Sequence, residues 1–278
     1  MASRGLLTLV VMGLGSACIG CASMINSVAF QPSDGGGDGL IGGDPSVIEK
    51  IIPAADGVAL HAYYLPKDTS DQAVIFFHGN HGNSTQRLGQ ARSLRELGVA
   101  VLLLSYRGYP KSGGTASEQG VYLDAEAILS YLSEDLGYAK PSMFILGRSL
   151  GSAVAIDVAQ DQPLAGLILV SPISSGADFA DYHGLGWARW LVGDSFDSLE
   201  KLERVSSPIL IIHGSEDSTL PIEMGRALYA AAPSGSTLIE VPGAGHNDLI
   251  SRAGRCYWVW ISRFIRGARP VGDTQCPE

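Results

Sequence analysis

The sequence has no excess of basic charge and no apolar stretch long enough to cross a bilayer. Its 278 residues include 19 lysines and arginines against 28 aspartates and glutamates, a formal net charge of −9. Nucleic-acid-binding proteins present a concentrated basic surface, so this balance argues against a nucleic-acid partner. The sequence also lacks a pair of C-x-x-C motifs, an H-E-x-x-H motif and a P-loop. No cofactor or metal is therefore implied.

Length and composition are typical of one folded domain with an extension. The chain is 46% hydrophobic and 17% charged, and its length is close to the size at which a single core stops growing. Residues 31–45 are rich in glycine and have little apolar surface to bury, which is typical of a flexible linker. We expect a tether at 21–45 and a folded domain at 46–278.

Residues 1–20 have the pattern of a targeting signal. Arg4 precedes an apolar run at 6–14 that is too short to span a bilayer, and small residues and two cysteines follow. This arrangement resembles the lipobox of bacterial lipoproteins, in which the signal is cleaved before a cysteine that is then lipidated. Cys21 fits best as the lipidation site and Cys18 is the alternative. An ordinary secretory signal and a retained anchor are the competing interpretations.

A lipoprotein signal implies a membrane-anchored protein of the bacterial cell envelope, on the periplasmic side and expected at the outer membrane. Disulfides persist outside the cytoplasm. The two remaining cysteines, Cys256 and Cys276, could join the C-terminal tail to the last helix. The alternative is one half-buried cysteine and one tail cysteine without a bond between them.

Apolar runs typical of strands alternate with segments of helical periodicity from residue 46 onward. Alternating units of this kind predict a mostly parallel sheet with helices on both faces, and a ligand crevice at the carboxyl ends of the strands. Strands are expected at 47–52, 58–65, 73–77, 99–104, 142–146, 167–170, 209–212 and 237–241. Helices are expected at 84–97, 117–136, 150–160, 221–232 and 247–265.

The segment G-R-S-L-G at 147–151 directly follows a predicted strand and precedes a predicted helix. This is the G-x-S-x-G pattern in the setting that a nucleophile elbow requires, with glycines that permit the tight turn. Ser149 is therefore the candidate nucleophile. The competing interpretation is a serine that only caps the helix.

A serine hydroxyl needs a neighbouring base to become a good nucleophile. Of the six histidines, His246 stands in a glycine-rich loop after the last strand and is the candidate base. His61 is interpreted as a surface residue of the early hairpin. His183 belongs to an insertion and could line a pocket, but its place in the chain order is wrong.

The acid that orients the histidine should follow an earlier strand. Asp217 is the candidate, with Glu216 and Asp248 as alternatives; Asp248 is better explained as the cap of the last helix. The order serine, aspartate, histidine is that of α/β-hydrolases. The expected oxyanion donors are the backbone N–H groups of Leu150 and Asn80.

Five motifs in this order resemble small α/β-hydrolases, in particular the depalmitoylating enzymes of eukaryotes and their bacterial relatives. The motifs are F-F-H-G-N at 76–80, Y-R-G-Y at 106–109, G-R-S-L-G at 147–151, H-G-S-E-D at 213–217 and G-A-G-H-N-D at 243–248. The resemblance implies an α/β-hydrolase fold with a short cap at about 174–207. Ser105 and His81 depart from the family pattern. His78 and the pair Tyr106 and Arg107 are expected to brace loops.

The predicted function is a serine hydrolase that cleaves carboxylic esters or thioesters through an acyl-enzyme. The cap contains Leu185, Trp187, Trp190, Leu191 and Phe196, which either line an acyl pocket or pack the cap on the domain. A small acyl substrate is expected. A peptidase resembling aminopeptidases, with Asp178, Asp181 or Asp194 binding the amine, is the enzymatic alternative. The other alternative is a non-catalytic envelope lipoprotein that uses the fold for binding.

Overall fold

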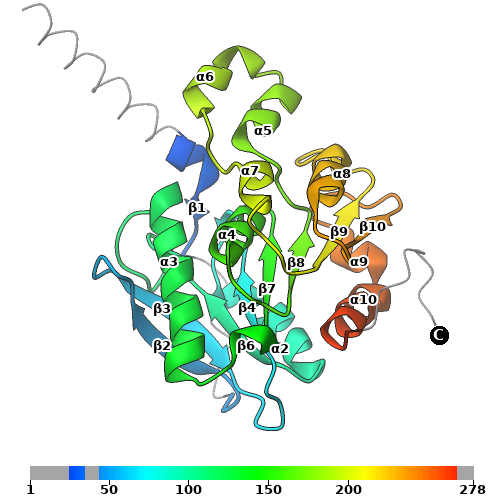
Figure 1. The fold of residues 1–278 in the computed structure, drawn as a ribbon. Helices are drawn as coiled ribbons and strands as arrows, with labels where there is room; N and C mark the ends of the chain where they lie inside the picture. Colours follow the sequence, from blue (N-terminus) through cyan, green and yellow to red (C-terminus); the bar gives the residue numbers. More distant parts are fainter. Residues whose placement is uncertain (1–24, 35–43, 268–278) are drawn as a thin grey trace, which may run out of the picture.

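The computed structural model describes residues 25–34 and 44–267, which form a central sheet between two layers of helices (Figure 1). The sheet order is β10-β9-β8-β7-β4-β6-β3-β2, and all neighbours from β10 to β6 are parallel. The strands are β2 Ile48–Pro53, β3 Ala59–Leu65, β4 Ala73–Phe77, β6 Ala100–Leu104, β7 Met143–Arg148, β8 Gly166–Val170, β9 Ile209–Gly214 and β10 Thr237–Val241. The predicted architecture, a mostly parallel sheet with helices on both faces, is confirmed.

The antiparallel hairpin of β2 and β3 closes one edge of the sheet, with Ile51 opposite His61. The expectation that His61 lies on the surface is wrong, because β3 lies between β2 and β6 and its side chains are covered. The His61 ring is buried and its Nε2 lies 2.6 Å from the Glu49 carboxylate. Burial lowers the pKa of His61 despite this carboxylate.

The helices divide between the two faces of the sheet, and each face has its own core. Strand residues alternate between the cores: Ile75 and Phe77 face one, Val74 and Phe76 the other. Helices α3 Glu118–Ser130, α4 Leu150–Ala159 and α8 Ile222–Ala231 cover the first face. Helices α2 Leu88–Glu96 and α10 Arg255–Ile265 cover the second. Both strand faces are buried, which explains the uninterrupted apolar runs in the sequence.

Two predicted helices are interrupted. The helix expected at 117–136 continues from α3 into a π-helical turn, Tyr131–Asp135, before Gly137 adopts a φ of 77°. The helix expected at 247–265 is divided into α9 Leu249–Ala253 and α10, because Gly254 has a φ of 56° and ψ of −133°. That backbone conformation cannot continue an α-helix.

The expected tether at 21–45 is wrong for its described part. Residues 25–29 form a helical turn and β1, Gln31–Pro32, pairs in parallel with β5, His81–Gly82. Between them Phe30 is 6% exposed and packs edge-on against Phe196 of the cap, with ring centroids 6.1 Å apart. This one aromatic and the short strand pairing hold the segment against the domain.

The signal segment 1–20, Cys18 and Cys21 lie outside the described residues, as does Cys276, so lipidation and the Cys256–Cys276 disulfide stay predictions. Among residues 25–34 and 44–267, no helix combines the length and the apolar character needed to cross a bilayer. The cap consists of α5 Gly176–Tyr182, a 3-10 turn Gly186–Ala188, α6 Arg189–Val192 and α7 Ser198–Leu202. Figure 1 shows β1 and α6 at the same end of the molecule.

Candidate active site

Ser149 occupies the turn between β7 and α4, with a φ of 53° and ψ of −123°. A non-glycine residue rarely adopts this strained conformation, and its presence here presents the hydroxyl above the sheet. The turn is tight because the flanking glycines lie against other backbone. A methyl group at Gly151 would overlap the carbonyl oxygen of Phe77, and one at Gly147 would overlap that of Gly151. The motif glycines are therefore required by close packing.

The three residues predicted as nucleophile, base and acid lie together at the carboxyl ends of their strands. His246 Nε2 is 3.1 Å from Ser149 Oγ, and His246 Nδ1 is 2.7 Å from Asp217 Oδ2. An ionised carboxylate accepts only, so Nδ1 carries the proton and Nε2 is left to accept one from the serine. This arrangement can perform proton transfer from serine to histidine.

Asp217 is almost fully buried, and hydrogen bonds keep it ionised. Its Oδ1 accepts from the backbone N–H groups of Thr219 and Leu220, at 2.9 and 2.8 Å. Burial alone would raise the pKa of Asp217, but the His213 ring, 3.5 Å away, and the hydrogen bond from His246 outweigh it and hold the pKa well below the ordinary aspartate value. The alternative acid Glu216 is exposed and does not contact His246 through any hydrogen bond that the described residues form.

Asp248 has a different task from the one expected. It is the N-cap residue directly before α9, but its side chain makes no capping hydrogen bond there. Its carboxylate instead accepts from the N–H of Gly245, at 2.7 Å, and pairs with Arg252. Asp248 therefore closes the loop that carries His246. Arg148 supports the same loop, donating to the His246 carbonyl at 3.0 Å.

The residues predicted to supply the oxyanion donors, Leu150 and Asn80, line the same cavity as Ser149. Leu150 is the first residue of α4, where backbone N–H groups have no partner within the helix. In the loop after β4, the Gly79 carbonyl lies 2.7 Å from His78 Nδ1. Because a trans peptide directs its C=O and N–H oppositely, this bond turns the Asn80 N–H away from His78. The role of His78 is thus to fix that peptide.

The two tyrosines of the Y-R-G-Y motif support the loop after β4, which contains His78. Tyr106 donates its hydroxyl to the His78 carbonyl at 2.8 Å, and Tyr109 donates to the Asn80 carbonyl. Burial lowers the pKa of His78 to about 4, so the ring is neutral at pH 7. Arg107 joins two parts of the domain, since it binds both Asp124 and Asp56. The expected bracing role of Tyr106 and Arg107 agrees with these contacts.

A cavity of about 440 Å³ opens at Ser149. Its apolar wall comes from the N-terminal segment, the cap and the loop before α8: Ile25, Val28, Ala29, Ile173, Phe179, Ala180, Leu185, Val192, Phe196 and Leu220. Phe196 is buried, whereas Trp187 is 74% exposed. His183 donates from Nε2 to the Thr219 carbonyl and does not line the cavity. The cap therefore both lines the cavity and presents aromatics to the outside.

Three parts of the site were not predicted from the sequence. The segment 25–29 forms one wall, and Arg87 and Arg148 line the cavity beside Ser149. Arg148 stands inside the G-x-S-x-G pentapeptide, so its closeness to the nucleophile could have been inferred. Arg87 and the N-terminal wall reach the site only through long-range packing, for which the sequence has no local signal.

Comparisons with known proteins agree with this architecture. A family model described as serine aminopeptidase S33 matches residues 68–200, and one described as TAP-like protein matches residues 181–276. An uncharacterized protein of Mycobacterium tuberculosis is 35% identical over 233 residues, which is 82% of this chain and 83% of that protein. The α/β-hydrolase domain-containing protein aho-3 of Caenorhabditis elegans is 34% identical over 66% of this chain and 55% of its own length.

Solved structures show the same fold at lower identity. An esterase of Pyrococcus furiosus matches with a TM-score of 0.69 and 19% identity, over 87% of this chain and 98% of that one. An α/β-hydrolase of Vibrio vulnificus matches with a TM-score of 0.71 and 22% identity, over 86% and 88%. Together with the relatives named above, these findings show that the chain belongs to the α/β-hydrolase superfamily.

Proposed function

We propose that this protein is a serine hydrolase that cleaves carboxylic esters or thioesters. The observation that carries the proposal is the continuous chain of contacts from Ser149 Oγ through His246 to the buried Asp217, at 3.1 and 2.7 Å. This chain opens into a mostly apolar cavity. A nucleophile, a base and an orienting acid in this relation are the equipment for acyl transfer.

In the proposed mechanism Ser149 Oγ attacks the carbonyl carbon while His246 Nε2 takes the hydroxyl proton. The N–H groups of Leu150 and Asn80 stabilise the oxyanion that develops. As the intermediate collapses, the bond to the alcohol or thiol breaks and the imidazolium returns its proton to that leaving group. Water, deprotonated by His246, then attacks the acyl-enzyme carbonyl; the bond to Ser149 Oγ breaks, the imidazolium returns the proton to that oxygen, and the acid is released. Asp217 stabilises the imidazolium in both halves.

The cavity favours an ester or thioester over a peptide with a free amine. No aspartate or glutamate of the described chain lines it. Of the acidic cap residues considered for amine binding, Asp178 accepts from the Ser174 hydroxyl at 2.6 Å and Asp181 pairs with Arg189. The apolar wall instead suits an acyl chain. The motif resemblance to depalmitoylating enzymes keeps thioesters among the candidate substrates.

The test is hydrolysis of p-nitrophenyl esters of increasing chain length, set against amino-acid p-nitroanilides. We expect ester turnover that falls by roughly 10³-fold or more in Ser149→Ala, because the covalent route is lost. Ser133→Ala is the matched control and should retain turnover, because Ser133 donates to the Ser130 carbonyl in the π-helical turn and does not line the cavity. Turnover of anilides alone would favour the peptidase, and turnover of neither would favour a binding module.

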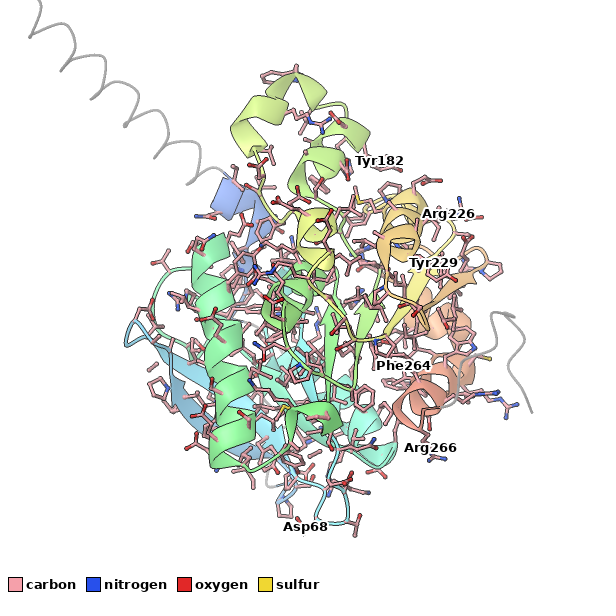
Figure 2. The ribbon with its side chains drawn as sticks, viewed as in Figure 1. Asp68, Tyr182, Arg226, Tyr229, Phe264 and Arg266 are labelled. Carbon is pink, nitrogen blue, oxygen red and sulfur yellow. The ribbon has the colours of Figure 1, made fainter. Side chains whose placement is uncertain are left out.

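We also propose that the protein is anchored in the bacterial envelope through a lipid on Cys21. Cys21 precedes Ile25, a residue of the cavity wall, by only four positions. The cap, which also lines the cavity, exposes large apolar side chains: Tyr182, Leu185 and Trp187 are 49%, 46% and 74% exposed. Figure 2 shows Tyr182 at the cap end and Asp68 at the opposite end. An anchor at Cys21 would bring the cavity mouth to the bilayer.

The anchor is tested by globomycin-sensitive processing and by partition into detergent in the native host. Both should be lost in Cys21→Ala and retained in Cys18→Ala. Loss in Cys18→Ala alone would move the lipid to Cys18. Globomycin-insensitive processing of the wild type would end the lipoprotein proposal.

A further inference from the structure

Two arginines line the cavity beside the nucleophile. Arg87 ends the 3-10 turn Thr85–Arg87, and Arg148 is the last residue of β7, directly before Ser149. They come from segments far apart in the sequence, and the fold brings both to the lining of this cavity, close enough for the charge of Arg148 to act on Arg87. Both side chains are partly buried. The site thus contains two positive charges that the proposed acyl transfer does not use.

Neither guanidinium is neutralised by a carboxylate of the described chain within ion-pair distance. Arg148 donates to the His246 carbonyl and to Asn247 Oδ1, at 3.0 and 3.3 Å, and Arg87 donates to the His81 carbonyl at 3.1 Å. The Nε of Arg87 is buried without a partner. Arg107 and Arg226 differ from this pair, since each binds two carboxylates.

This arrangement has an electrostatic cost that an anion would remove. Burial lowers the pKa of both arginines, and the charge of Arg148 lowers that of Arg87 further. At Arg148, Tyr257 and the Asp217 carboxylate offset part of the effect of burial. Like charges in a partly buried wall disfavour each other, whereas a phosphate accepts hydrogen bonds from several guanidinium N–H groups at once. The wall therefore has the chemistry of a phosphate site.

The position of the pair identifies which part of a substrate would carry the anion. Arg148 contacts the backbone of His246, the residue that must return a proton to the leaving group. The apolar side chains Phe179, Val192 and Phe196 come instead from the cap. An acyl chain would pack under the cap, and a charged leaving group would lie toward the arginines.

We propose that Arg87 and Arg148 form a subsite for a phosphate on the leaving alcohol, so that the substrate is an acyl ester of a phosphorylated alcohol such as a monoacyl glycerol phosphate. This inference rests on the proposed hydrolase function. Because Arg148 is adjacent to Ser149, the phosphate must lie only a few bonds from the scissile ester. The phosphates of an acyl-coenzyme A, at the end of a long pantetheine arm, fit this requirement less well.

The test compares kcat/KM for 1-octanoyl-glycerol-3-phosphate with that for neutral 1-octanoyl-glycerol, using the full chain. The wild type should prefer the phosphorylated ester by about tenfold or more, and the preference should fall as salt is added. Arg87→Gln should reduce the ratio about tenfold, and Arg87→Lys should restore part of it. Arg95→Gln on α2, whose side chain donates to the Pro66 carbonyl, is the matched control and should leave the ratio unchanged.

A wild-type ratio near one, or a ratio that Arg87→Gln leaves unchanged, would overturn the subsite. A second comparison sets octanoyl-coenzyme A against octanoyl-N-acetylcysteamine. If the preference for the coenzyme A thioester exceeds the preference for the phosphorylated over the neutral glycerol ester, the assignment to a phosphate close to the ester is overturned. Both outcomes differ from failure of the hydrolase proposal, in which no ester, neutral or charged, is turned over.

Discussion

Asp217 is the residue whose environment is most specialised for one charge state. It is 4% exposed and receives hydrogen bonds from two backbone N–H groups as well as from His246. A buried carboxylate without such donors would have a raised pKa. Because these donors are in place only when the 217–220 loop is folded, folding of the loop keeps Asp217 ionised, as the proposed mechanism requires.

Asp217→Asn should inactivate the protein and reduce its stability in a pH-dependent way. The folded-state pKa of Asp217 is lowered from 3.8, so its stabilising contribution is present above that value and is lost as the pH falls below it. The difference in unfolding free energy between wild type and Asp217→Asn should thus shrink in acid. Chemical denaturation at pH 7 and at successively lower pH measures it. A difference that grows in acid would contradict this account.

The strained backbone at Ser149 predicts that the position of the nucleophile lowers the stability of the protein. Its φ of 53° is unfavourable for any residue with a Cβ, and glycine adopts it more readily. Ser149→Gly should therefore be about 1 kcal/mol more stable than Ser149→Ala, and both should be inactive. Thermal unfolding of the two variants side by side is the measurement. Equal stability would show that the turn stores no strain.

At the scale of elements, the strands were predictable because their physical cause is local. A parallel strand buried on both faces must be apolar throughout, and 73–77 is a strand in the structure with the same bounds as in the prediction. The break at Gly254 was not predictable. One glycine within an amphipathic helical pattern also fits an unbroken helix, and only tertiary packing decides.

The elbow between β7 and α4 depends on backbone contact with β4. Gly151→Ala places a methyl group against the carbonyl oxygens of Phe77 and His78, so it should cost about 1–3 kcal/mol or prevent folding. Gly89→Ala in α2, where the added methyl group meets open space, is the matched control and should stabilise the helix by about 0.5–1 kcal/mol. Similar stability of the two variants, measured by denaturant unfolding, would argue against the close approach.

For the whole molecule, the sequence predicted the convergence of Ser149, Asp217 and His246 but not the complete cavity. Chain order and strand ends carry the information for the three residues. The N-terminal wall has no such signal, because the segment 25–29 is held through the neighbouring Phe30 and a two-residue strand pair, and neither produces a periodic pattern in the sequence. The pairing of Arg87 with Arg148 likewise depends on packing across the fold.

Phe30→Ala should detach the N-terminal wall from the cap. Phe30 is buried in the core and packs on Phe196. Where the segment unfolds together with the domain, removing this ring should lower the free energy of unfolding by about 3 kcal/mol. The KM for acyl esters should rise because Ile25 and Val28 no longer enclose the acyl chain of the substrate. Val28→Ala, at a side chain 55% exposed, is the stability control. An unchanged melting temperature and KM for Phe30→Ala would show that the wall is dispensable.

The most direct measurement is covalent labelling of the purified protein with a fluorophosphonate, followed by identification of the labelled peptide. An activated serine reacts with this probe, whereas ordinary serines do not. We expect a single label on Ser149 that disappears in Ser149→Ala and is strongly reduced in His246→Ala. No label on the folded wild type, or a label that persists in Ser149→Ala, would contradict it.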